Sequence, residues 1–151
     1  MLRNRAVWRF LAAAVAGLLA SLFTLHMGEA LSALNRPFLF PPFWMLPVGW
    51  TAALIAAAGA MRYAVGLIHK KTVAAFYVSL GLVVVWAFVF FRLGMRGTGF
   101  VAGFFLTGIW LRNRRLLREF SQDAAKWMTC ATAWAGYATY LNLGVWFLNR
   151  G

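Results

Sequence analysis

The chain has 151 residues, of which 63% are hydrophobic, 17% are aromatic and only 12% are charged. A water-soluble domain would carry about a quarter charged residues, so the composition argues against a soluble enzyme and indicates a bilayer protein. Lys and Arg number 15 against 3 Asp and Glu, for a formal net charge of +12. In a polar chain this excess would suggest nucleic-acid binding, but in so apolar a chain no nucleic-acid partner is expected.

Five uncharged intervals divide the chain, at residues 10–25, 37–61, 72–91, 97–111 and 127–149. A helix that crosses the hydrocarbon core needs about 20 residues, and Arg or Lys side chains at its ends can extend to the headgroups, so the shorter intervals also qualify. The runs are apolar on every side, which is not the alternating pattern of a transmembrane barrel. The sequence therefore predicts a single all-α membrane domain over 1–151, with helices near 6–27, 42–65, 71–92, 96–116 and 124–148.

The basic residues are divided unequally between the two ends of these helices. Eleven lie at the N-terminus or at the second-to-third and fourth-to-fifth connections, and the other four lie at the opposite end. Because cytoplasmic loops hold an excess of Lys and Arg, we expect the N-terminus in the cytoplasm and the C-terminus outside. Anionic headgroups of membrane lipids are then the partners of the positive charge, and a bacterial cytoplasmic (inner) membrane is the expected location.

All four prolines lie close together in NRPFLFPPFWMLPVGW, the first long connection and the start of the second helix. Proline fixes φ and restricts the residue before it, so residues 37–42 should be stiff and extended and should end where the helix begins. The segment is either a tight connector or a lid over a cavity between the helices. The candidate lid residues are Arg36, Pro37, Pro41, Pro42 and Trp44.

The eight tryptophans fall into two groups by their predicted depth. Five lie within one or two turns of a helix end, where indoles anchor helices at the bilayer interface: Trp8, Trp44, Trp110, Trp127 and Trp146. Three are deeper, and they either line a ligand pocket or pack between helices: Trp50, Trp86 and Trp134.

The last predicted helix presents one stripe of spaced residues. Trp134, Ala138 and Leu141 recur at i, i+4 and i+7, so they share a face. If Trp50 and Leu54 of the second helix face the same space, a flat apolar molecule could lie between the two indoles.

Three segments carry a family resemblance. RPFLFPPFW (36–44), followed by Trp50, is similar to a K-P-x-x-x-P-P-x-W…W motif, and WAFVFF (86–91) is similar to W-x-x-x-F-F. The stretch AAKWMTCATAWAGYATYLNLGVWFLN (124–149) matches A-A-x-L-L-x-P-Y-x-x-W-x-x-F-A-x-x-L-N-x-x-x-W-x-x-N without a gap. On these motifs the chain resembles the TspO/MBR family of translocator proteins, also called tryptophan-rich sensory proteins.

The resemblance implies a five-helix membrane bundle that binds a porphyrin-like or other flat hydrophobic ligand, of the tetrapyrrole, sterol or carotenoid class. The role would be sensory, regulatory or that of a carrier, in a homodimer, and no cofactor is obligatory beyond a porphyrin or haem-type ligand. The chain has Leu143 where the sterol motif of animal members has Tyr, which argues against sterol recognition. The alternative is a non-enzymatic accessory subunit of a larger membrane complex, such as a pigment–protein assembly. Porphyrin breakdown, proposed for some relatives, is a third hypothesis.

Several isolated residues have a structural and a functional interpretation. Asn142 should hydrogen-bond to another helix, because an unpaired amide in hydrocarbon is costly. His26 either ligates a haem iron or is simply solvated, and Cys130 is expected to be packed and unreactive. Gly99 and Gly103 form a GxxxG that permits close packing, within the chain or across a dimer. The three carboxylates lie at connections, so no acid–base pair for catalysis is expected.

Overall fold

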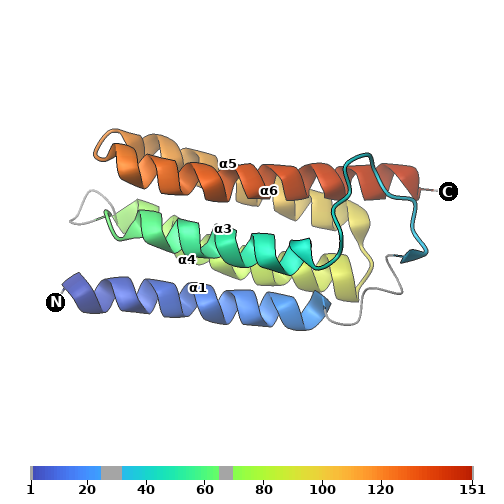
Figure 1. Ribbon diagram of the computed structural model, residues 1–151, viewed down its shortest axis with the longest axis horizontal. Helices are drawn as coiled ribbons and strands as arrows, with labels where there is room; N and C mark the ends of the chain where they lie inside the picture. Colours follow the sequence, from blue (N-terminus) through green and yellow to red (C-terminus); the bar gives the residue numbers. More distant parts are fainter. Residues whose placement is uncertain (1, 25–31, 65–69, 151) are drawn as a thin grey trace.

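A computed structural model describes residues 2–24, 32–64 and 70–150, and all regular structure in these ranges is helical. The helices are α1 (Leu2–Thr24), α3 (Met45–Met61), α4 (Lys70–Ala87) with its π-helical continuation η2 (Phe88–Arg92), α5 (Arg96–Arg118) and α6 (Gln122–Leu148). They run along a common axis and alternate in direction (Figure 1). The prediction of an all-α chain with five long helices is confirmed for the described residues.

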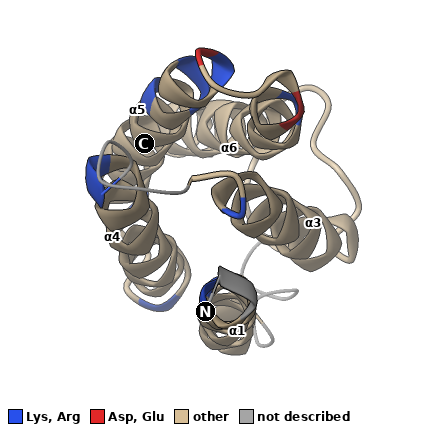
Figure 2. Cartoon of the chain, turned by 90° about the vertical axis from the view of Figure 1, so that its left-hand side faces the viewer, with Lys and Arg blue, Asp and Glu red and all other residues tan. Residues whose placement is uncertain are grey.

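The helices are arranged as a ring around one core. α1 packs against α3 and α4, and α3 also packs against α6. α5 closes the ring by packing against both α6 and α4. Figure 2 looks along the axis and shows this order. The centre of the ring is filled by large side chains, Trp50, Trp86 and Trp110 among them, so any interior site must form within this aromatic core.

Three helices start two or more residues away from their predicted positions, and α1 is one of them, since it begins at Leu2 and not at residue 6. α3 begins at Met45 and not at Pro42, because the Met45 N–H donates to the Pro42 carbonyl at 2.9 Å and closes a turn before the helix. Pro47 then lies in the first turn of α3, where its missing N–H leaves no hydrogen bond unmade. α6 begins at Gln122, since Ser121 caps it by accepting from the Ala124 N–H at 3.2 Å.

The end of α4 widens into a π-helical turn. The Leu93 N–H donates to the Phe88 carbonyl at 3.1 Å, an i to i+5 bond, and Gly94 ends the segment at φ 64, a left-handed value suited to glycine. This turn brings both Phe90 and Phe91 to the interior cavity described below.

The loop before α3 is not extended throughout, as the prolines had suggested. The Phe40 N–H donates to the Pro37 carbonyl at 3.2 Å and closes a β-turn. Leu39 takes φ 65 in this turn, a left-handed value that costs a non-glycine residue about 1–2 kcal/mol. The predicted extended conformation of 37–42 is therefore wrong in its first half.

Two predictions about single side chains are also wrong. Trp110 is not an interfacial anchor: it is fully buried, and its indole N–H donates to Ser79 Oγ at 2.8 Å, because the residue faces α4. Cys130 is exposed on α6, since the buried face of that helix runs through Met128 and Ala131. His26 lies outside the described residues.

The GxxxG of α5 is used inside the chain. A Cβ on Gly99 would lie 2.6 Å from the Phe90 ring, and a Cβ on Gly103 would lie 3.0 Å from Thr139 Oγ1. Both glycines therefore allow close approach to η2 and α6, and this face of α5 is not available to a second copy of the chain.

By length and composition, two of the described helical segments could cross a bilayer. They are Asn4–Thr24, with a mean hydropathy of 1.9, and Lys70–Arg92, with 2.4, and α3 is a shorter apolar helix. Figure 2 looks onto the end of the bundle where the α3–α4 and α5–α6 connections lie, and Lys and Arg gather around its rim. The larger group of basic residues identified in the sequence therefore lies at one end of the bundle.

Candidate functional site

A small cavity lies inside the ring, toward the end of the bundle away from the basic rim. Its volume is about 20 Å³, which is room for about one water molecule. The loop, α3, α4, η2 and α6 all contribute to its wall. The lining side chains are Phe40, Leu46, Trp50, Trp86, Phe90, Phe91, Ala138, Leu141, Asn142 and Val145.

Aromatic rings in mutual contact form one side of this cavity. The ring centroids of Trp50 and Trp86 are 4.9 Å apart, and Phe90 stacks on Trp86 at 5.9 Å. Trp110 meets the other side of this cluster, edge-on to Trp50 at 6.4 Å. Such contacts stabilise the packed arrangement, so the indole faces are covered by one another.

Three residues that line this cavity carry a buried hydrogen-bond donor without a partner, as does Trp134, which lies outside it. Trp50 Nε1, Trp86 Nε1 and Asn142 Nδ2 are all buried and have no hydrogen-bond partner. The amide nitrogen of Asn142 thus lacks the interhelical hydrogen bond that the sequence predicted. A buried donor without an acceptor costs about 1–3 kcal/mol, and such groups are rare in folded proteins. The three donors suit a guest with hydrogen-bond acceptors, such as carbonyl, carboxylate or ring nitrogen atoms.

Four of the six predicted ligand-binding residues meet at this cavity: Trp50, Trp86, Ala138 and Leu141. Leu54 instead packs toward α1, where a Cβ on Gly17 would come within 3.2 Å of Leu54 Cδ1. Trp134 is half-buried and lies against Gly49 of α3, so closely that a Cβ on Gly49 would be 2.1 Å from the ring. The structure therefore does not place Trp50 and Trp134 on opposite sides of a shared space, and the indole pair at the cavity is Trp50 and Trp86.

The predicted lid residues divide into inward and outward groups. Pro37 and Pro41 are buried, whereas Pro42 and Trp44 are exposed. The Arg36 guanidinium lies 4.6 Å from the Phe43 ring centroid and 5.7 Å from that of Phe40, within the range of a cation–π contact. None of these lid residues lines the cavity.

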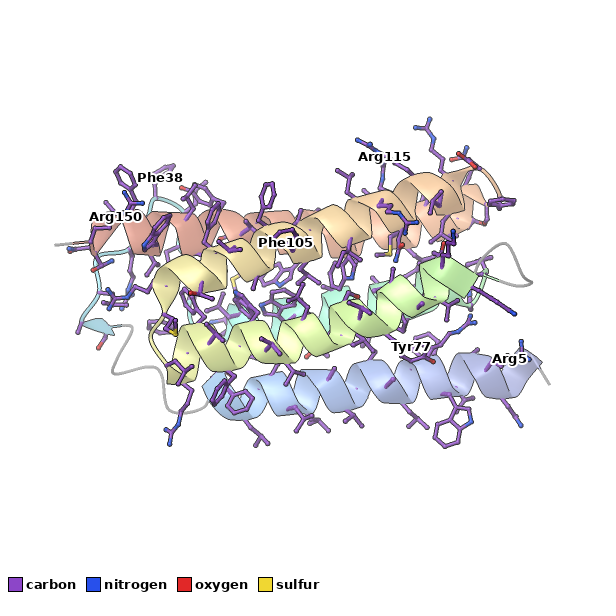
Figure 3. All side chains as sticks on the ribbon, turned by 180° about the vertical axis from the view of Figure 1, so that it is seen from behind. Arg5, Phe38, Tyr77, Phe105, Arg115 and Arg150 are labelled. Carbon is purple, nitrogen blue, oxygen red and sulfur yellow. The ribbon has the colours of Figure 1, made fainter. Side chains whose placement is uncertain are left out.

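Phe40, which the sequence interpretation missed, is the loop residue that lines the cavity. Its neighbour Phe38 is 81% exposed and points away from the bundle (Figure 3). The turn at Leu39 separates these two directions, and a positive φ at a leucine could not have been read from the sequence.

Two tyrosines of α6 fasten the loop. The hydroxyl of Tyr137 donates to the Leu39 carbonyl at 2.6 Å, and that of Tyr140 donates to the Phe38 carbonyl at 2.8 Å. Pro37 packs so closely on Gly144 that a Cβ there would be 2.4 Å away. The i, i+3 spacing of the tyrosines was the available sequence signal, because it puts both hydroxyls on one face of the helix.

The side chains that line the cavity also bear on whether it could hold a haem. The lining residues include no His, Cys, Met or carboxylate, and the described part of the chain holds no group of three metal-ligating side chains. A haem iron at this cavity would therefore find no axial ligand among its lining side chains, whereas the acceptor atoms of a metal-free porphyrin match the unpartnered N–H groups.

Comparison with known proteins identifies the family of this chain. No curated protein matches the chain, but the TspO/MBR family matches residues 9–147, nearly the whole chain. This agrees with the helical fold and with the motifs at the loop, at α4 and at α6. The chain belongs to the TspO/MBR family, whose members are membrane-associated proteins.

Proposed function

We propose that this chain binds a flat, mostly apolar ligand with hydrogen-bond acceptors, such as a porphyrin, around Trp50 and Trp86, in a sensory or carrier role. The observation that carries the proposal is that three residues of one aromatic-lined cavity, Trp50, Trp86 and Asn142, each carry a buried N–H donor without a partner. Ligand sites commonly combine apolar and aromatic walls with a few convergent polar groups.

The proposal includes a bilayer around the ring, crossed by all five helices, in a bacterial cytoplasmic membrane with the basic end in the cytoplasm. Large apolar side chains on the outside of the helices support it, for example Leu18 (67% exposed), Val78 (63%) and Phe104 (63%). Soluble monomers rarely expose apolar patches of more than a few hundred Å², and the basic end follows the cytoplasmic excess of Lys and Arg.

Ligand entry requires the cavity to enlarge. A bound molecule of drug size needs about 300–1,000 Å³, far more than the 20 Å³ present. Phe40 is the lining residue held by the loop and not by a helix, so its withdrawal is the smallest change that opens the space. The described state is then the closed state, in which the α6 tyrosines hold the loop down.

Titration of the purified protein with protoporphyrin IX, followed by tryptophan fluorescence, tests the proposal. We expect saturable quenching. Trp50→Phe and Trp86→Phe keep an aromatic ring and lose the N–H donor, so each should weaken binding by about 3- to 10-fold. Trp127→Phe is the matched control, because Trp127 is 41% exposed and packs near Gly59, away from the cavity.

Two results would contradict the proposal: absence of saturable quenching, or equal affinity in the cavity variants and the control. Trp134→Phe separates the two versions of the site, since an unchanged affinity places the ligand at Trp50 and Trp86 without Trp134. If the protein lacks affinity and co-purifies with a larger complex in mild detergent, the accessory-subunit alternative holds. A Soret band that changes on illumination of the bound porphyrin would indicate breakdown.

A homodimer is part of the proposal. The α5 glycines are occupied inside the chain, so its interface must use another face. Size-exclusion chromatography with light scattering measures the oligomeric state, and a monomeric mass would contradict the proposed dimer.

A further inference from the structure

A second and larger hollow lies at the basic end of the bundle, between α1 and α4. Its volume is about 660 Å³, and its walls include Arg5, Trp8 and Arg9 from α1 and Lys70, Val73 and Tyr77 from α4. Trp50 and the cavity lie toward the start of α3, whereas Ala64, just after α3, lines this groove. The two sites therefore occupy opposite ends of the bundle.

Arg9 is the unusual residue of this groove. Its side chain is only 9% exposed, and the guanidinium donates to the Met61 and Ala64 carbonyls at the end of α3. These carbonyls carry the partial negative charge of a helix C-terminus, which offsets only part of a full positive charge. Arg9 therefore remains a buried cation without a carboxylate partner among the described residues.

Among the described residues, the surroundings of Arg9 add positive charge and provide no counter-charge. Arg5 and Lys70 are exposed at the same mouth, one from each wall. The carboxylates in the described part of the chain are Glu119, which follows α5, and Asp123, which lies in the first turn of α6. The acidic segments in Figure 2 lie across the ring from α1. Asp123 already pairs with Lys126 at 3.2 Å. The groove thus lacks an anion that the described residues could supply.

The polarity of the groove changes along its length. Lys70 opens α4 at the rim, Val73 lies one turn further in, and Tyr77 lies about 10 Å further along the axis than Lys70. Figure 3 shows Tyr77 in the space between α4 and α1, on the half of the bundle that carries Arg5. Trp8 of the other wall is 67% exposed, as is typical of an indole at the bilayer interface.

A charged mouth that leads into an apolar and aromatic trough matches an amphiphile. We propose that this groove binds an anionic phospholipid, with its phosphate among Arg5, Arg9 and Lys70 and the start of an acyl chain along Val73 and Tyr77. Basic recesses between helices on the cytoplasmic side favour such headgroups. A free phosphate would share the cationic mouth but would leave the apolar trough empty.

Native mass spectrometry of the full chain, titrated in detergent with phosphatidylglycerol or phosphatidylcholine, tests this inference. We expect tighter retention of phosphatidylglycerol. The double variant Arg5→Gln/Lys70→Gln should weaken it by about 30-fold, from a typical contribution for each of two cations near anionic lipid. Arg9 is left unchanged because it also holds the end of α3.

The matched control is Arg112→Gln/Arg115→Gln, which removes two exposed charges at the same end but from α5. We expect wild-type affinity from it. Equal retention of the two lipids would overturn the proposal, since it shows no preference for an anionic headgroup. An equal loss in the control variant would also overturn it, since it indicates diffuse attraction to the basic end. Displacement of the lipid by excess inorganic phosphate would also overturn it and would assign the groove to soluble anions. These variants leave the aromatic cavity unchanged, so their outcome is independent of the porphyrin titration.

Discussion

The contact between Gly49 of α3 and Trp134 of α6 allows a sharp test of how the bundle is packed. A Cβ built on Gly49 would lie 2.1 Å from Cη2 and Cζ2 of the indole and 2.5 Å from Cε2. Carbon atoms in contact are normally about 3.5–4.0 Å apart, so Gly49→Ala creates an overlap of about 1.5 Å. The ring must leave its place, or α3 and α6 must separate.

The expected cost follows from these two ways of relieving the overlap. Overpacking a well-filled contact costs about 1–3 kcal/mol, against a gain of up to about 1 kcal/mol from replacing a helical glycine by alanine. An overlap of this size sets the cost at the upper end of that range, so the net loss is about 1–2 kcal/mol. We therefore expect Gly49→Ala to lower the unfolding temperature by about 2–8 °C, because 1 kcal/mol corresponds to about 2–4 °C in a chain of this size. Thermal unfolding in detergent, followed by tryptophan fluorescence, measures this.

Two further variants isolate the cause. Gly81→Ala is the matched control, since a Cβ on Gly81 of α4 would meet nothing within 4 Å, and we expect equal or higher stability. Gly49→Ala/Trp134→Leu removes the obstructing ring, so the alanine should cost much less in that background, a coupling that a double-mutant cycle measures. The packing argument is refuted if Gly49→Ala is as stable as wild type, or if the alanine costs as much with Leu at 134.

Three other predictions concern a buried hydrogen bond, the attachment of the loop and the glycines of α5. Ser79→Ala removes the acceptor of the Trp110 indole at 2.8 Å and should cost about 1–3 kcal/mol in chemical unfolding; an unchanged midpoint would contradict it. Tyr137→Phe with Tyr140→Phe should speed amide hydrogen exchange across residues 36–44 with little change in global stability, and unchanged exchange would show that these bonds do not hold the loop. Gly103→Ala, whose Cβ would lie 3.0 Å from Thr139 Oγ1, should lower the unfolding temperature without changing the oligomeric mass; a loss of dimer would place the GxxxG at an interface.

The sequence predicted the helices better than it predicted their faces. The charged residues at the ends of the apolar intervals predicted the first residues of α4 and α5 to within one residue, because a charged side chain is costly inside the apolar core. α3 is apolar on every side, and such a helix has no preferred face in its sequence. The expectation that Trp50 and Leu54 face one space therefore failed: Trp50 borders the cavity, whereas Leu54 packs on α1.

Part of the site could be predicted and part could not. Trp50, Trp86, Ala138 and Leu141, which line the cavity, could be named as candidates because family motifs and helical spacing mark them. Phe40 depends on the left-handed backbone of Leu39, which leucine rarely adopts, so no residue preference indicates it.

The closed loop and the unpartnered donors oppose each other energetically. Two tyrosine hydroxyls hold the loop, each typically contributing about 0.5–1.5 kcal/mol. The left-handed Leu39 costs about 1–2 kcal/mol, and each unpartnered N–H at the cavity costs about 1–3 kcal/mol. Burial of Pro37 and Pro41 also favours this arrangement of the loop. A ligand that supplies acceptors to those N–H groups relieves the penalty only in the state that can bind it. It therefore binds that state more tightly than the other, and such a difference in affinity shifts the population toward the binding state. If the proposed ligand binds, these N–H groups are the polar contacts that the cavity lining offers it, since no charged residue lines the cavity.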